Sequence, residues 1–181
     1  LYSSELTTLN YLTTGNQNEQ WVAANCVDGL VEYDKYGVVQ PGLAEKWETS
    51  ADQLTWTFHL RKGVKWVDYQ GNEVAEVKAQ DFVDAAQYLL NPDNKSETVN
   101  AFYSVVANAE DYFNKKITDF SKVGVKATDD YTLVYTLKQV YITSIKETYN
   151  KEMATLAPEM YKRGEIDQAY LSADILDDWM K

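Results

Sequence analysis

The residues from Leu54 to Leu60 alternate strictly between apolar and polar side chains, and this pattern constrains the fold more than any other. The apolar set is Leu54, Trp56, Phe58 and Leu60, and the polar set between them is Thr55, Thr57 and His59. Seven residues with a period of two predict a β-strand that packs one face on a core and leaves the other face polar. The chain must therefore contain a sheet with one covered face.

Helices and further strands are predicted on both sides of this strand. Residues 6–12 read as a short strand or an extended arm, and Asn16 followed by Glu19 resembles a capping box at the start of a helix. The predicted helices cover residues 19–30, 79–90 and 102–113, with further ones carrying Met153 and Trp179, and the predicted strands cover residues 64–66, 123–127, 133–137 and 140–145. Because helices and strands mix without strict alternation, the predicted class is α/β in the broad sense, a mixed α+β chain.

Net charge argues against two classes of partner. The 181 residues contain 17 Lys and Arg against 28 Asp and Glu, which gives a formal net charge of −11. Such a field repels phosphate backbones and anionic lipid surfaces, so nucleic acid and direct membrane adhesion are not expected partners. The hydrophobic fraction of 45% is that of an ordinary globular domain.

Residues that usually carry catalysis or hold metals are scarce. The single histidine, His59, lies on the polar face of the predicted strand, and Cys26 lacks the clustered partners of a zinc site. We therefore predict no enzymatic activity, no catalytic residue, no metal and no cofactor, with Cys26 as a small apolar core residue. One alternative stays open: the many acids, Tyr and Trp also fit a carbohydrate-binding or glycoside-hydrolysing surface module.

The run from Ala44 to Trp66 resembles a known family. It contains Ala44-Glu45-Lys46-Trp47-Glu48, the alternating strand, and Leu60-Arg61-Lys62-Gly63-Val64-Lys65-Trp66, and it is followed by Ala79-Gln80-Asp81-Phe82-Val83. These segments resemble the extracytoplasmic solute-binding proteins of peptide and nickel ABC importers, above all the oligopeptide-binding branch. The resemblance implies that Trp56, Phe58 and Trp66 are core residues of a small lobe.

The same resemblance implies a partial type II periplasmic-binding-protein-like fold. Residues 1–42 would form the first part of the large lobe, residues 43–138 the small lobe, and residues 140–181 an incomplete return to the large lobe. The Gly-Pro-Tyr and Asn-Pro-x-Tyr-Trp phrases of the family are missing around Gln139, where the sequence also lacks a turn between two predicted strands. We interpret this junction as an internal deletion, or as a join across missing residues, in a truncated chain.

By resemblance, the function is that of the solute-binding component of an oligopeptide ABC transporter. Such proteins capture extracellular peptides between lobes through backbone hydrogen bonds and deliver them to the permease subunits. The implied location is the extracellular face of the cytoplasmic membrane, reached through a lipid anchor upstream of Leu1. The residues expected to contact the peptide are the loop residues Thr14, Gly15, Asn16, Gln17 and Asn18, together with Tyr103.

Overall fold

The computed structural model describes residues 5–139. The chain divides into two compact units, residues 1–140 and 141–181, and the description below concerns the first. The strand predicted at residues 140–145 and the helices predicted around Met153 and Trp179 lie outside the described residues.

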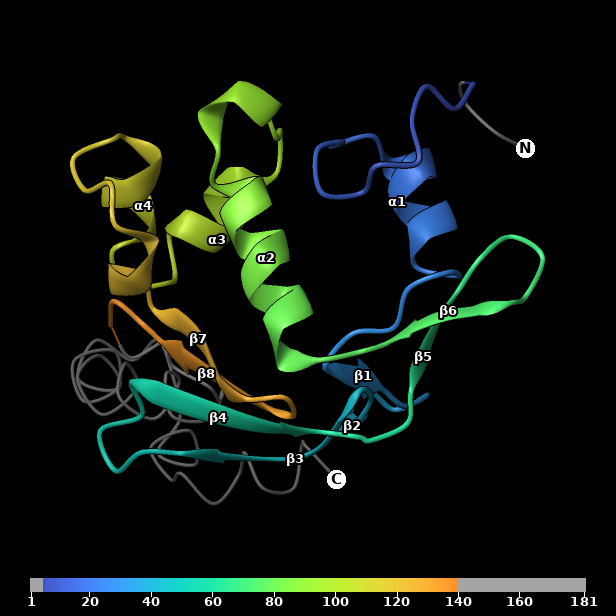
Figure 1. Ribbon diagram of the computed structural model, residues 1–181, viewed down its shortest axis with the longest axis horizontal. Coiled ribbons are helices and arrows are strands. Elements are labelled where there is room, and N and C mark those ends of the chain that lie inside the picture. Colours follow the sequence, from blue (N-terminus) through green and yellow to red (C-terminus); the bar gives the residue numbers. More distant parts are fainter. Residues whose placement is uncertain (1–4, 140–181) are drawn as a thin grey trace, which may run out of the picture. The chain divides into compact units, whose positions relative to one another are not determined.

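A four-stranded antiparallel sheet forms the centre of this unit (Figure 1). Its strands are β3 (Ala44–Thr49), β4 (Thr55–Leu60), β7 (Val125–Asp129) and β8 (Thr132–Thr136), in the spatial order β3-β4-β8-β7. The strands predicted at residues 54–60, 123–127 and 133–137 are thus confirmed. No strand was predicted at residues 44–49, because β3 is an edge strand with mostly exposed side chains and few apolar residues.

Strand β4 has a neighbour on each side, and its apolar residues share one face of the sheet. Phe58 lies opposite Trp47 of β3 and Leu133 of β8, while Trp56 lies opposite Tyr135. Leu133 is fully buried and Phe58 packs against the core. Period-two alternation places these side chains on the covered face, as the sequence predicts.

Helix α2 (Ala79–Leu89) packs on the covered face of the sheet, mainly against β7 and β8 (Figure 1). It ends just before Asn91-Pro92, as predicted, with Leu90 as its C-cap. The smaller elements on this side are η1 (Pro92–Asn94), α3 (Val99–Tyr103), α4 (Ala109–Phe113) and η2 (Phe120–Lys122). The buried core consists of Ala44, Leu60, Ala79, Val83, Ala86, Leu90, Val99, Val106, Ala109, Val123, Val125 and Leu133.

The single helix predicted over residues 102–113 is wrong, because the chain forms two short helices there. Between α3 and α4, Val106 makes an isolated antiparallel bridge to Leu137. Asn108 then adopts a left-handed conformation with φ of 59°. A left-handed residue interrupts an α-helix, and the bridge ties the interruption to the end of β8.

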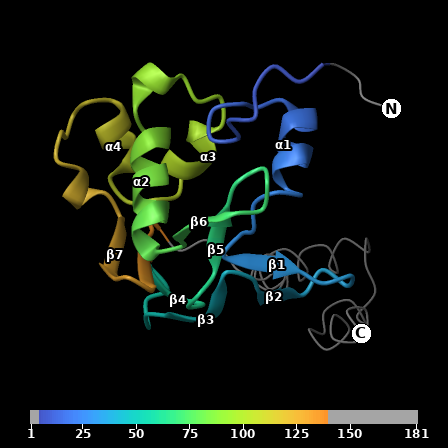
Figure 2. The same ribbon diagram turned by 45° about the vertical axis from the view of Figure 1, so that its right-hand side comes forward.

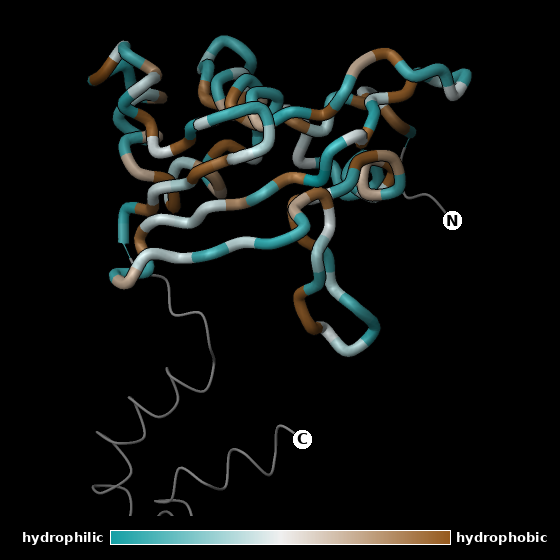
Figure 3. Tube along the Cα trace, turned by 60° about the horizontal axis from the view of Figure 1, so that its bottom comes forward, coloured by the Kyte–Doolittle hydropathy of each residue, from teal (hydrophilic) through white to brown (hydrophobic). Residues whose placement is uncertain are grey.

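Two hairpins extend from the sheet (Figure 2). They are β1 (Val31–Tyr33) with β2 (Val39–Pro41), and β5 (Lys65–Val67) with β6 (Glu73–Glu76). The first hairpin stands away from the sheet (Figure 3). Its residues Tyr33 and Val38 are exposed. Trp66 on β5 was expected in the core, but it is 36% exposed, so that prediction is wrong. Its strand pairs with β6 in a two-stranded ribbon outside the four-stranded sheet.

The first helix is shorter than predicted. Helix α1 covers Gln17–Ala23, whereas the sequence predicts residues 19–30. The side-chain amide of Asn25 donates to the carbonyl oxygen of Trp21, and the chain then turns toward Gly29 and β1. Cys26 follows the helix in this turn and is exposed, so its predicted place in the core is wrong.

Candidate functional site

Five of the six predicted contact residues form one segment, residues 14–18, in which Thr14, Gly15 and Asn16 precede α1 and Gln17 and Asn18 begin it; this segment is called the loop below. Gly15 and Gln17 are exposed and Asn16 is half-buried, while Thr14 and Asn18 are buried. The loop can therefore offer the Gly15–Gln17 stretch to a ligand, whereas Thr14 and Asn18 hold the loop in place. Thr14 and Asn18 are 7% and 5% exposed, so a direct contact of either with a ligand stays a prediction.

Tyr103, the sixth predicted residue, lies in α3. Its ring packs against Phe113 at a centroid distance of 5.4 Å and belongs to the layer around the buried core. Among the described residues, no hydrogen bond or ring contact joins Tyr103 to the loop. A role for Tyr103 in binding stays a prediction.

The N-terminus of α1 is capped by one half of the predicted capping box. The side chain of Asn16 accepts a hydrogen bond from the backbone N–H of Asn18 at 2.9 Å. The carboxylate of Glu19 does not return to the Asn16 backbone, whose N–H donates to the Thr14 hydroxyl at 3.0 Å. Asn16 therefore fixes the shape of the loop, and the Glu19 carboxylate bonds elsewhere.

Glu19 anchors the N-terminal arm beneath the loop. Its Oε1 accepts hydrogen bonds from the Thr7 N–H at 2.6 Å, the Thr7 hydroxyl at 2.8 Å and the Thr8 N–H at 3.1 Å. Hydrogen-bond donors lower the pKa of Glu19 to about 2. The hydrogen bond from the Thr14 hydroxyl has the largest effect, and those from Thr7 and Thr8 add to it. A buried carboxylate with several donors stays ionised, so Glu19 ties the arm to α1 as a charged group.

A second segment, residues 96–98, packs against the loop. The Ser96 hydroxyl donates to the Leu12 carbonyl at 2.7 Å, and the Glu97 N–H donates to the Thr13 carbonyl at 2.9 Å. In return the Gly15 N–H donates to Glu97 Oε2 at 2.8 Å. Sequence reasoning missed Ser96 and Glu97, because they lie more than 80 residues from the loop and no local pattern links them.

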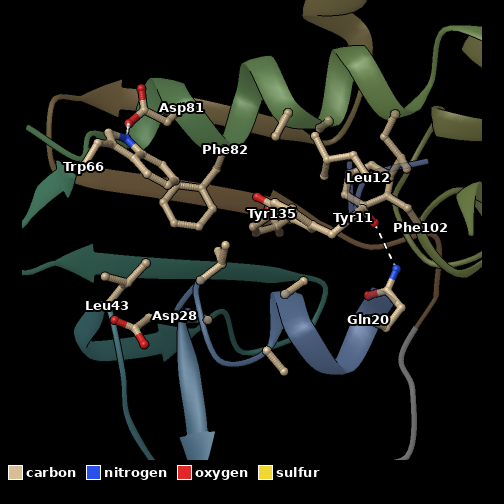
Figure 4. A pocket seen from close by; sticks show the side chains of 17 residues that line it. Tyr11, Leu12, Gln20, Asp28, Leu43, Trp66, Asp81, Phe82, Phe102 and Tyr135 are labelled. Atoms are coloured by element: carbon tan, nitrogen blue, oxygen red, sulfur yellow. Dashed lines mark hydrogen bonds between the residues drawn. The ribbon is translucent and has the colours of Figure 1, made fainter. Parts of the chain in front are cut away.

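An apolar cavity of about 410 Å³ lies between the N-terminal arm, α1 and α2, and none of residues 14–18 lines it (Figure 4). Its walls come from the arm at Tyr11 and Leu12, from one side of α1 and from α2 with Phe82 and Leu89. Two of the polar side chains at its edge have hydrogen-bond partners. Gln20 Nε2 donates to the carbonyls of Tyr11 and Thr14, and Trp66 Nε1 donates to Asp81 Oδ2. A cavity of this composition suits apolar groups.

The described residues show no arrangement that suggests catalysis. Within residues 5–139, no three His, Cys, Asp or Glu side chains are placed to hold a metal ion. His59 Nε2 pairs with Glu48 Oε1 at 2.7 Å across strands β4 and β3. No helix among the described residues is long and apolar enough to cross a membrane.

Comparison with known proteins places this chain among binding proteins. The family model of bacterial extracellular solute-binding proteins, family 5 middle, matches residues 38–174. The oligopeptide-binding protein SarA of Streptococcus gordonii is 46% identical over 139 residues, 77% of this chain. AmiA of Streptococcus pneumoniae, also an oligopeptide-binding protein, is 45% identical over 77% of this chain. Each match covers 21% of the relative, so the chain spans about a fifth of these proteins.

Solved structures agree with the sequence relatives. A periplasmic oligopeptide-binding protein of Borrelia burgdorferi superposes with a TM-score of 0.68 at 31% identity, over 77% of this chain and 27% of that one. Haemophilus influenzae OppA, solved in complex with the peptide RPPGFSPFR, gives a TM-score of 0.65 at 30% identity over 82% of this chain and 30% of that one. The predicted mixed α/β class and the oligopeptide-binding-protein fold are thus confirmed, as a fragment. The chain belongs to family 5 of the bacterial extracellular solute-binding proteins.

Proposed function

We propose that this chain is part of the solute-binding component of an oligopeptide ABC importer. In this role it captures extracellular peptides and delivers them to permease subunits. The observation that carries the proposal is the segment of residues 14–18, in which Gly15 and Gln17 are exposed and Asn16 is half-buried, on a fold shared with peptide-binding proteins. Backbone groups bind peptides of many sequences, because they pair with the part that all peptides share.

The names of the relatives support a peptide as the solute. SarA and AmiA are both named oligopeptide-binding proteins, and the Haemophilus protein was solved with a nonapeptide. These names favour peptides over the carbohydrate alternative. Members of this family bind solutes rather than transform them, so we assign no reaction to the chain.

We propose that residues 1–42 and 140–181 belong to the large lobe and residues 43–138 to the small lobe. The hydrogen bonds from the 12–15 loop to residues 96–97 would then join the two lobes on one side of the cleft. The uncovered apolar residues of the β1–β2 hairpin fit a face that further parts of a longer protein cover. We place the protein on the extracellular face of the cytoplasmic membrane, held by a lipid anchor upstream of Leu1.

Peptide affinity of loop variants tests this proposal. The full-length protein, as its host expresses it, is titrated calorimetrically with penta-alanine. The double variant Asn16→Ala/Gln17→Ala is expected to weaken binding by about tenfold, because it disturbs the capped loop and its exposed edge. Gln87→Ala, which changes an exposed glutamine on α2, is the matched control and keeps the affinity. Equal affinities of both variants, with both folded by circular dichroism, would contradict the assignment of the site.

A further inference from the structure

An exposed charged side chain that contacts the candidate loop comes from a distant part of the sequence. Residues 13–18 are all neutral. Glu97, which is exposed, lies against them and accepts the Gly15 N–H through Oε2 at 2.8 Å. Its own N–H donates to the Thr13 carbonyl at 2.9 Å, so both the backbone and the side chain of Glu97 are fixed on the loop. The carboxylate therefore has a defined position at the site.

The close approach of Glu97 requires a glycine on the loop. A Cβ added to Gly15 would lie 2.9 Å from Glu97 Oε2 and 3.3 Å from Glu97 Cβ. Both distances are shorter than ordinary van der Waals contacts, so any larger residue at position 15 would displace the carboxylate. The absence of a side chain at Gly15 thus leaves room for the Glu97 carboxylate, and the Gly15 N–H orients it.

This carboxylate carries a charge that the described residues do not neutralise. None of the five ion pairs found within residues 5–139 includes Glu97, and its hydrogen bond uses only Oε2. Lys95, two residues earlier, is exposed and makes no ion pair with it. The other acid at the loop, Glu19, is buried and serves the arm. Glu97 Oε1 is therefore an exposed anionic acceptor at the loop that has no partner among residues 5–139.

We propose that Glu97 determines specificity by binding positively charged groups of the peptide at this loop. The inference rests on the proposed function and names a substrate preference for it: peptides with an ammonium or guanidinium group at the position facing Glu97. A carboxylate held by one N–H donor keeps an oxygen for a second donor, and a cation is the partner that also compensates its charge. The overall negative charge of the chain acts in the same direction.

Matched peptides test this preference in the full-length protein as its host expresses it. The probes are penta-alanine and its variants with a central Lys, norleucine or Glu, each with a free and with an acetylated N-terminus. The unmodified protein is expected to bind the Lys peptide about fivefold more tightly than the norleucine peptide, and salt should reduce this ratio. Acetylation removes the charge of the peptide N-terminus. If Glu97 binds the Lys side chain, the preference for Lys over norleucine remains in the acetylated peptides. If Glu97 binds the terminal ammonium, acetylation weakens binding and the Lys preference does not depend on Glu97.

Three variants distinguish recognition of charge from a structural role. Glu97→Gln keeps an acceptor for the Gly15 N–H but removes the charge, so the preference for cationic peptides should vanish while norleucine-peptide affinity stays. Glu97→Lys should reverse the preference toward the Glu peptide. Glu73→Gln, an exposed acid on β6, is the control and should change nothing.

The possible outcomes separate the inference from the function on which it rests. A cationic preference that Glu97→Gln leaves intact, or no preference in the unmodified protein, overturns the role of Glu97. An equal loss for all peptides in Glu97→Gln also overturns it, since Glu97 would then only position the loop. Failure of the unmodified protein to bind any of the peptides overturns the proposed function itself.

Discussion

Replacing Gly124 with alanine should destabilise the protein through steric conflict alone. Gly124 precedes β7, and its N–H donates to the Ala107 carbonyl at 2.8 Å while its carbonyl accepts from the Thr136 N–H at 2.7 Å. Its φ is not in the left-handed region, so alanine can adopt the same backbone conformation. A Cβ there, however, would lie closer than 3.0 Å to the Thr136 carbonyl oxygen and 3.1 Å from Ala107 Cβ.

The expected loss of stability in Gly124→Ala follows from the backbone segments that the added methyl group displaces. Backbone atoms lie on both sides of the added methyl group, so the β7–β8 edge must shift and weaken the bond between Thr136 and Gly124. One lost hydrogen bond costs about 1 kcal/mol, and an overpacked site costs about 1–3 kcal/mol more. We therefore expect Gly124→Ala to lower the free energy of unfolding by about 2–4 kcal/mol.

A second glycine supplies the matched control. Gly37 has a φ of +79° and no atom within 4 Å of its added Cβ, so Gly37→Ala has a conformational cost without a clash. That cost is about 1 kcal/mol. Urea unfolding of the 181-residue chain, followed by tryptophan fluorescence, gives both values. The steric reasoning is refuted if Gly124→Ala unfolds at the same or a higher urea concentration than Gly37→Ala with an unchanged m-value.

Three further outcomes are expected. Gly15→Ala should cost less than about 1 kcal/mol in urea unfolding, because its clash is with the flexible Glu97 side chain, yet it should reduce any Glu97-dependent peptide preference. Leu133→Ala, at a fully buried position, should cost about 2–5 kcal/mol, whereas Val67→Ala, at a position 60% exposed, should stay within about 0.5 kcal/mol; equal costs would contradict the assigned core. The pKa of Glu19 is lowered from 4.5 to about 2, so its contribution to stability is complete above pH 4.5 and is lost as the pH falls toward 2. Thermal melts across this range should show a shallower pH dependence for Glu19→Gln, and identical profiles would argue against the anchoring role.

Local patterns were sufficient for the elements that bury a regular apolar face. Strand β4 was predicted because its alternating residues pack on one side of the sheet, and α2 because its apolar stripe meets that sheet. Strand β3 was not predicted, because an exposed edge strand owes its conformation to its neighbour rather than to its own residues. The end of α1 and the break between α3 and α4 were misjudged for a related reason. Asn25, Val106 and Asn108 act through contacts that no periodicity reveals.

The candidate site divides in the same way. The sequence by itself determined the family and the mixed α/β class, because the family pattern is continuous along the chain. It also predicted the cap at Asn16, whereas the binding role of residues 14–18 stays a prediction. Only the tertiary structure decided which loop residues are exposed, that Glu19 holds the arm, and that Glu97 lies against Gly15. The physical reason is distance along the chain: a contact between residues 82 positions apart exists only once the sheet and α2 have brought the two loops together.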